Sequence, residues 1–400
     1  MIIIFFYLVF LIIVPQEWIP PFIDMPVDVI LFPIWVIYLI VSGKNQNVVW
    51  KKNDQFFLYF IIWLLISYIG HDKTEMTRQH AFYYIKWFVM YWLVILSAED
   101  QRGMRSVIKI MLVLAGFIAI EGIFHRFSAD GTGWAGNPLD WGGEIDPDGN
   151  AKGRVSWIGI FGGPGVFSVL FVMLLPFCFQ FLFKPFTTSQ KIMGLILSSL
   201  FLTIIYFSGS RGGFLGAFAV VGVFGLLKYN ISFMSILKIG GLVVTLFMLA
   251  PSHLTTMNDS SRSAQHRVEM WAAGSDMVER DPMFGVGRGN FKKWSGKLIA
   301  HNSAIEIMGE LGFPGFFFWI GMIYAFYKTI YQYLLENNNG VGLSGDDLIT
   351  YTYVKSLGLS FMGYIVCSFF VTLEYETFYI LLALGSTVGN KLKNPVVFLT

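Results

Sequence analysis

The sequence predicts an all-α, polytopic membrane protein of about twelve transmembrane helices. Of its 400 residues, 55% are hydrophobic and only 14% are charged, whereas about a quarter of the residues of a soluble globular protein are charged. The mean hydropathy of +0.61 also indicates a membrane protein. The apolar runs contain glycine and proline and lack the period-two alternation of barrel strands, so we expect the spans to be helical.

Apolar runs long enough, or nearly long enough, to cross a bilayer occur along the whole chain, at residues 2–14, 27–42, 56–70, 81–97, 107–124, 164–184, 191–207, 212–228, 233–250, 303–334, 351–371 and 375–390. Several are shorter than the about 20 residues that a full span needs. The first run follows Met1 without the basic segment or cleavage site of a secretory signal, which predicts a first transmembrane helix. No internal repeat or composition shift divides the chain, so residues 1–400 are expected to form one domain.

Positive charges in the short connections predict the orientation. They lie in alternate connections, at Lys44, Lys51, Lys52, Arg102, Arg105, Lys109, Lys184, Lys191, Lys228, Lys391 and Lys393. By the positive-inside rule, these connections and both termini are cytoplasmic. Two long polar loops, 126–163 and 251–302, then lie on the outer face, because long loops cross a membrane largely regardless of their charge.

One arginine lies in a tight turn between two apolar runs. The turn Ser208-Gly-Ser-Arg-Gly-Gly213 brings Arg211 to the membrane boundary, at or before the start of the following helix. Flanking glycines let the backbone approach a ligand, and free amides at a helix start favour an anion. The alternative is that Arg211 snorkels to lipid headgroups beside helix-packing glycines.

The loop 251–302 is strongly cationic. Its residues 263–278 have the apolar spacing of an amphipathic helix that lies on the membrane, with Arg267 near its start and Asp281-Pro282 at its end. Residues 284–291 are too rich in glycine for a helix, and no strand precedes them as a dinucleotide-binding unit would require. We expect most cations of the loop to form a solvated or headgroup surface, with Arg288 a further candidate for substrate binding.

His301-Asn302-Ser303 closes the loop and opens the next apolar run, and Asn302 or Ser303 is suited to cap that helix. A histidine near Arg211 and Arg267 could take a proton, because its side chain titrates near neutrality. Glu306 and Glu310 follow with i, i+4 spacing, either paired with loop cations or orienting His301. The residues Gly312-Phe-Pro-Gly315 should then loosen the helix.

The other long loop is acidic. Asp146-Pro-Asp148 fits the Asp-x-Asp pattern of metal-dependent glycosyl transfer, but Asp-Pro-Asp-Gly-Asn150 is also an ordinary turn, the reading we prefer. Arg154 follows and could reach the same outer cavity. Cys178 and Cys367 lie far apart in apolar runs, so we expect packed thiols and neither a disulfide nor a metal site.

Three segments together resemble the superfamily of O-antigen ligases and O-antigen polymerases of bacterial inner membranes. They are Ser208–Gly213 at a helix start, Arg267 to Trp271 with Gly285-Val-Gly-Arg-Gly-Asn-Phe291 behind it, and His301-Asn302 followed by Glu310-Leu-Gly-Phe-Pro-Gly315. In addition, Pro15-Gln-Glu-Trp-Ile-Pro20 resembles the exosortase-associated O-glycosylation ligases. The chain departs from many ligases of the family after His301-Asn302, where they carry bulkier residues.

The resemblance implies an enzyme that moves a glycan from undecaprenyl diphosphate to an acceptor hydroxyl at the periplasmic face, without a cofactor, an essential metal or a nucleic-acid partner. The acceptor would be lipid A core, a growing glycan, or a protein Ser or Thr. Arg211, Arg267 and His301 would be catalytic, and Arg154, Arg288, Asn302 and Glu306 would bind substrate. The alternatives are a polymerase that extends the lipid-linked glycan, and a transporter, which should place charges at mid-membrane and contain repeated halves.

Overall fold

The computed structural model describes residues 1–23, 25, 27–41, 50–70, 75–140, 153–229, 234, 257–296, 299–372 and 375–391. The structure is 79% helical and contains no strand in this part of the chain, which confirms the predicted all-α class. The helices are α1 Ile2–Ile12, α2 Val27–Val41, α3 Lys52–Gly70, α4 Glu75–Ser97, α5 Gln101–Phe127, α6 Pro164–Phe181, α7 Thr188–Phe207, α8 Arg211–Tyr229, α10 Met257–Arg280, α11 Phe291–Ser295, α12 Ser303–Glu336, α13 Gly345–Ser368 and α14 Glu376–Lys391, with short 3-10 turns η1 Pro15–Glu17, η2 Pro20–Phe22, η4 Gly159–Phe161 and η6 Asn338–Gly340.

Each predicted apolar run coincides with one of these helices except 233–250, nearly all of which lies outside the described residues. Among the described residues, five helices are long and apolar enough to cross a membrane: α5, α6, α7, α8 over Arg211–Lys228, and α12. The apolar helices α1 and α14 are shorter, with 11 and 16 residues. The chain is therefore a multi-pass membrane protein.

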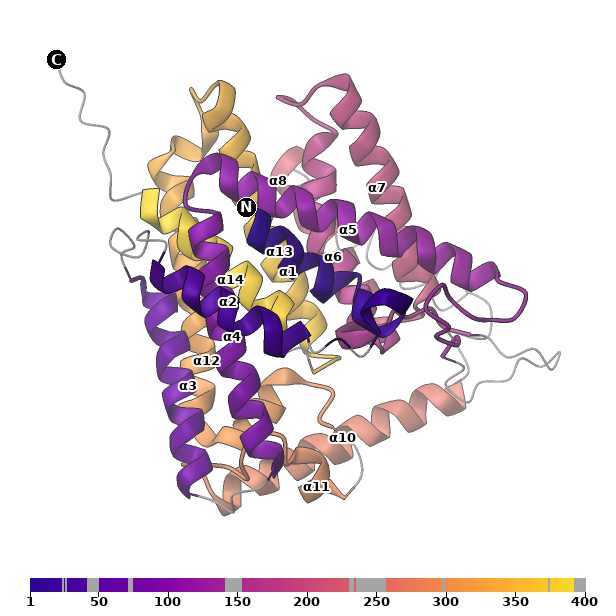
Figure 1. Cartoon of the computed structure of the whole chain (residues 1–400), viewed down its shortest axis with the longest axis vertical. Coiled ribbons are helices and arrows are strands. Elements are labelled where there is room, and N and C mark those ends of the chain that lie inside the picture. The colour runs from indigo at the N-terminus through magenta and orange to yellow at the C-terminus, as the bar shows by residue number, and fades with distance from the viewer. Residues whose placement is uncertain are drawn as a thin grey trace.

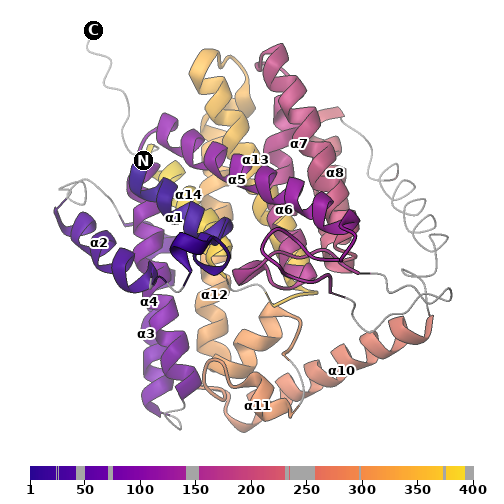
Figure 2. The same cartoon turned by 45° about the vertical axis from the view of Figure 1, so that its right-hand side comes forward.

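The apolar helices form one bundle, and α14 lies inside it. Residues Phe378 to Leu384 of α14 are completely buried. In Figures 1 and 2, α3 and α4 run side by side along one edge of the bundle, and α6, α7 and α8 lie on the other side. The helix α10 extends across one end of the molecule, next to α11 and the start of α12 (Figure 2). The site-bearing segments are therefore gathered at one end of the bundle.

The helix α10 is amphipathic, as its apolar spacing predicts. Met270 and Met277 on its inner face are buried with Val286, Phe291 and Ala300 in a small core separate from that of the bundle, while its outer face is exposed. The helix ends at Arg280, and the Asp281 side chain accepts hydrogen bonds from the backbone amides of Met283 and Phe284 at 3.2 and 2.9 Å. These bonds turn the chain at the predicted Asp-Pro boundary.

A kink in α12 receives the glycine-rich loop that follows α10. Gly312 has φ +66 and ψ −171 inside the helix, so α12 changes direction where the sequence predicted a looser segment. At the kink, an amide and a carbonyl of α12 bond the loop: Phe313 N–H donates to the carbonyl of Pro282 at 2.9 Å, and the carbonyl of Glu310 accepts from Gly287 N–H at 2.9 Å. The loop 281–290 is thereby fixed against the outer part of α12.

Candidate functional site

Arg211 is the first residue of α8, as predicted. Ser208 ends α7, Gly209 adopts φ +58, and the Ser210 hydroxyl accepts a hydrogen bond from Gly213 N–H at 3.1 Å, which caps the new helix. A Cβ atom on Gly212 would lie 2.7 Å from Cβ of Phe370, so only glycine allows this close contact. The turn therefore holds Arg211 at a helix N-terminus, where the backbone favours an anion.

Arg267 comes to the same place from α10. Its guanidinium lies 5.5 Å above the ring of Phe370, the side chain that also packs on Gly212. Burial lowers the pKa of Arg267, and the nearby positive charge of Arg211 lowers it further. Because an arginine stays protonated even after such a shift, two guanidinium charges are held near each other, and among the described residues no carboxylate forms an ion pair with either of them. An anionic ligand would relieve their repulsion.

His301 lies just before α12 in the left-handed region, with φ +51. Asn302 caps the helix, because its side-chain oxygen accepts a hydrogen bond from Ile305 N–H at 3.2 Å. Burial lowers the pKa of His301, and the charge of Arg267 lowers it further. His301 is therefore largely neutral at physiological pH and able to accept a proton. The structure thus places Arg267 within electrostatic range of both Arg211 and His301.

Unlike Arg211 and Arg267, Arg288 is occupied by protein partners, because its side chain is 4% exposed and lies in an ion-pair network. Its guanidinium pairs with Glu310, lies 3.6 Å from the Glu306 carboxylate and donates from Nε to the Tyr84 hydroxyl at 3.2 Å. Glu310 also accepts a hydrogen bond from Phe291 N–H at 2.7 Å. Of the two interpretations of these glutamates, pairing with a loop cation is the one that the structure shows.

Glu306 connects two segments that border the cationic cluster, the name we give to Arg211, Arg267 and His301. Its Oε2 accepts hydrogen bonds from Ala300 N–H at 3.2 Å and from the Thr372 hydroxyl at 2.7 Å. Ala300 directly precedes His301. Thr372 is two residues after Phe370, whose ring lies under the guanidinium of Arg267. Glu306 and Asn302 are 6% and 5% exposed. Their side chains therefore hold the backbone around His301.

Arg154 lies beside the α7–α8 turn. The Cβ position of Gly209 is 3.1 Å from Cδ of Arg154, and the Arg154 guanidinium is paired with Asp140 at 3.0 Å. Its side chain remains 42% exposed, so the charge is accessible from outside. Asp146 and Asp148, the alternative metal ligands, lie outside the described residues.

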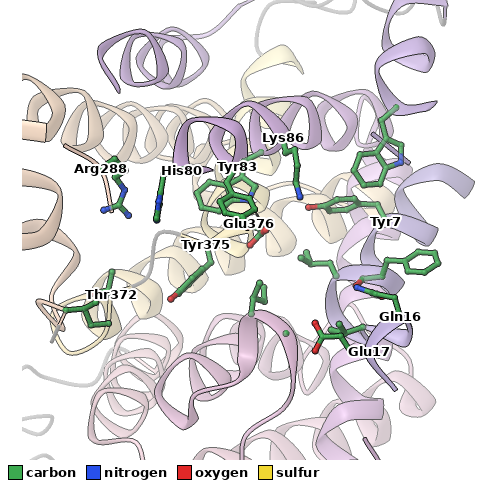
Figure 3. Close-up of a pocket in the computed structure, with 18 of the residues that line it drawn as sticks. Tyr7, Gln16, Glu17, His80, Tyr83, Lys86, Arg288, Thr372, Tyr375 and Glu376 are labelled. Carbon is green, nitrogen blue, oxygen red and sulfur yellow. Dashed lines mark hydrogen bonds between the residues drawn. The ribbon is translucent and has the colours of Figure 1, made fainter. Parts of the chain in front are cut away.

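A cavity of about 660 Å³ lies next to the cluster. Figure 3 shows Arg288 and His80 toward one end of it, with Tyr7, Gln16 and Glu17 at the other. Lys86 and Glu376 face the space between them (Figure 3). The sequence reasoning missed His80, Lys86 and Glu376. A signal existed, since the positive-inside rule that places the two long loops outside also predicts the connections 16–26 and 71–80, with Gln16, Glu17 and His80, on the outer face.

Comparison with known families gives a match over residues 196–320 to the family model of the O-antigen ligases. The matched part contains Arg211, Arg267 and His301, and also Arg288, Glu306 and Glu310. It begins after Arg154. The predicted resemblance to the O-antigen ligase superfamily is confirmed by this match. No match was found among curated proteins.

Proposed function

We propose that this chain, with its O-antigen ligase match over residues 196–320, moves an oligosaccharide or polysaccharide from undecaprenyl diphosphate to an acceptor hydroxyl. The observation that carries the proposal is the meeting of Arg211, Arg267 and His301 from three separate segments. Two adjacent guanidinium groups match a diphosphate in charge and hydrogen-bonding geometry. A histidine with a lowered pKa beside them matches the need for a proton acceptor.

The reaction is a displacement at the anomeric carbon of the lipid-linked sugar. The acceptor oxygen forms the new glycosidic bond while the bond from the anomeric carbon to the diphosphate oxygen breaks, and the diphosphate leaves with the electron pair. Arg211, Arg267 and the amides at the start of α8 stabilise the charge that develops on that oxygen. His301 takes the proton of the acceptor hydroxyl. A single displacement of this kind inverts the anomeric configuration and uses no metal.

The remaining candidate residues support this centre. Arg154, exposed beside Gly209, contacts the diphosphate or the first sugars of the donor. Arg288, Glu306 and Asn302 act by holding the loop and the start of α12, which revises the direct substrate-binding role expected for them from the sequence. Positioning of this kind matters because a displacement of about 1 Å can cost about 10²-fold in rate.

The proposed setting is the bacterial inner membrane, crossed about twelve times, with the loops 126–163 and 251–302 in the periplasm. The five helices that qualify as spans and the amphipathic α10 at one end of the bundle support this arrangement. The polyprenyl chain of the donor would lie in the bilayer against the apolar helices, and α10 would rest at the lipid surface.

The test is glycan transfer by membranes that contain the full chain, an undecaprenyl-diphosphate-linked oligosaccharide and the lipids, glycans and proteins of the host. Arg211→Ala and Arg267→Ala should each lower transfer by at least about 10²-fold, since one electrostatic contact to the developing charge is worth that much. His301→Gln should lower transfer comparably. Mass spectrometry of the products identifies the acceptor and separates ligation from extension of the lipid-linked glycan.

The matched control is Arg280→Ala. Arg280 is on the same helix as Arg267, but it is exposed at the far end and stacks on Trp294 at 5.5 Å. Its removal should leave transfer unchanged at equal protein level. Full transfer by Arg211→Ala or Arg267→Ala would contradict the proposed function, and so would an Arg280→Ala variant that loses transfer as completely as they do.

A further inference from the structure

A short segment after α13 contacts the supports of both parts of the cationic cluster. It consists of residues 370–372, which we call the link, and it lies beyond residue 320, where the match to the O-antigen ligase model ends. The amides of Phe370 and Val371 both donate to the carbonyl of Cys367, at 2.9 and 3.1 Å. These bonds end α13 and fix the start of the link.

We propose that the link positions the cationic cluster, with Phe370 acting on the arginines and Thr372 acting on His301. The inference rests on the proposed function and adds two positioning residues to it. Neither residue takes part in the chemistry, because each acts by fixing a residue that does.

Phe370 contacts both segments that carry the arginines. Its ring lies 5.5 Å from the guanidinium of Arg267, a cation–π arrangement that favours one direction of that side chain. Its Cβ atom lies 2.7 Å from the Cβ position of Gly212, the residue after Arg211. The thiol of Cys367 bonds the same turn, since it donates to the carbonyl of Gly212 at 3.3 Å. Phe370 therefore fixes Arg267 relative to the start of α8.

Thr372 acts on the segment that carries His301. Thr372 is 6% exposed, and its hydroxyl donates at 2.7 Å to Oε2 of Glu306, which also accepts from Ala300 N–H at 3.2 Å. The other oxygen, Oε1, lies 3.6 Å from the guanidinium of Arg288. The hydroxyl thus holds the carboxylate at Ala300 against the attraction of Arg288. His301 follows directly with φ +51, a conformation that a non-glycine residue keeps only where its surroundings impose it.

The link itself is held from two further sides. The carbonyl of Val371 accepts from the Ser303 hydroxyl at 3.4 Å, and Cγ2 of Val371 lies 3.0 Å from the Cβ position of Gly165 in α6. Phe370 and Thr372 are two residues apart, so their Cα atoms are separated by at most about 7 Å. One short piece of chain therefore joins the support of the arginines to that of the proton acceptor. A displacement needs such a fixed spacing, because the leaving diphosphate and the attacking hydroxyl meet at one carbon.

The first experiment is direct binding of undecaprenyl diphosphate to the full chain in lipid nanodiscs. Phe370→Leu keeps the Cβ atom that packs on Gly212 but removes the aromatic face under Arg267, so the Kd should rise about fivefold. Phe370→Tyr keeps that face and should bind within about twofold of the wild type. In an Arg267→Ala background, Phe370→Leu should weaken binding by less than about twofold, because Phe370 acts through Arg267.

The second experiment is the rate of transfer by membranes at varied amounts of the lipid-linked donor. Thr372→Val removes the hydroxyl at nearly constant volume and should lower kcat about tenfold, through a small displacement of His301. The KM for the donor should change by less than about twofold, since the arginines keep their places. Thr372→Ser keeps the hydroxyl and should keep the wild-type kcat.

The chain offers a matched control for each substitution. Phe369→Leu makes the same change at a neighbouring side chain that is 51% exposed. Thr352→Val removes a hydroxyl that donates to the carbonyl of Ile349 inside α13, at 2.7 Å. Both controls should leave the Kd, the KM and kcat unchanged at equal protein level.

Three results would overturn the inference: an unchanged Kd in Phe370→Leu, an undiminished effect of Phe370→Leu when Arg267 is already absent, or a Thr372→Val variant that raises the KM as much as it lowers kcat. A Phe370→Tyr or Thr372→Ser variant as impaired as the corresponding Leu or Val variant would do the same. Failure of the proposed function is distinct, because it would appear as wild-type membranes that transfer no glycan. Binding needs no turnover, so it would still decide the role of Phe370.

Discussion

The buried ion pair between Arg288 and Glu310 yields the sharpest stability prediction. The two residues are 4% and 1% exposed, and they join the glycine-rich loop to α12. Glu310→Gln removes the charge but keeps a side-chain oxygen to accept from Phe291 N–H. Breaking one half of a buried pair costs about 3–5 kcal/mol. Because the Glu306 carboxylate remains 3.6 Å from Arg288, we expect the lower end, about 3 kcal/mol.

The assay is unfolding of the purified full chain by SDS, followed by the fluorescence of its 12 tryptophans. Arg288→Met should also destabilise, because it leaves two buried carboxylates without their cation. The double variant Arg288→Met with Glu310→Gln should be more stable than the sum of the single losses predicts, with a coupling free energy of at least about 1 kcal/mol. Arg280→Met, at an exposed position, should change the stability by less than about 0.5 kcal/mol. If the stability losses of the two single variants sum to that of the double variant within about 0.5 kcal/mol, the two residues do not act as a pair and the reasoning is refuted.

Three further predictions concern activity. Burial and the charge of Arg267 lower the pKa of His301. The rate of transfer should therefore stay constant around neutral pH and fall only below the ordinary histidine pKa of about 6.5, where His301 becomes protonated. A pH–rate profile with its midpoint above that value would be inconsistent with His301 as the base. Gly212→Ala puts a Cβ atom 2.7 Å from Cβ of Phe370 and should lower initial rates about tenfold or more by moving Arg211. Gly163→Ala has no atom within 4 Å of its new Cβ and serves as the control, so equal loss in both variants would contradict the argument. Treatment with EDTA should leave the rate of transfer unchanged, and a loss that a divalent ion restores would favour the metal-dependent alternative at Asp146 and Asp148.

The local structure around the site could largely be predicted because short-range signals govern it. A glycine-flanked serine turn predicts the start of α8 at Arg211, and Asp281-Pro282 predicts the end of α10. The apolar spacing of residues 263–278 predicts the buried face of α10, although the helix begins earlier, at Met257. These features depend on hydrogen bonds and periodicity within a few residues, so the sequence carries them directly.

Partnerships between distant residues could not be predicted in the same way. The sequence offered pairing with a loop cation as one interpretation of Glu310 but did not single out Arg288, which it marked as a candidate for substrate binding. The glycines beside Arg288 let the loop fold onto the kink of α12 and bury its charge against Glu310. The hydroxyl of Thr372 reaches Glu306, although the two are far apart in the chain. Such contacts depend on how helices pack, which hydrophobic periodicity does not encode.

By itself, the sequence predicted a helical membrane protein that resembles the O-antigen ligases, because apolar runs and short motifs are local properties. It also singled out Arg211, Arg267 and His301 as residues for phosphate and proton chemistry. Only the tertiary structure decided that Arg267 comes within electrostatic range of both Arg211 and His301, that Arg288 pairs with Glu306 and Glu310 beside them, and that a separate cavity is lined by Arg288 and Glu306. The physical reason is that electrostatic range and enclosed volume arise from the packing of segments that are remote in the chain.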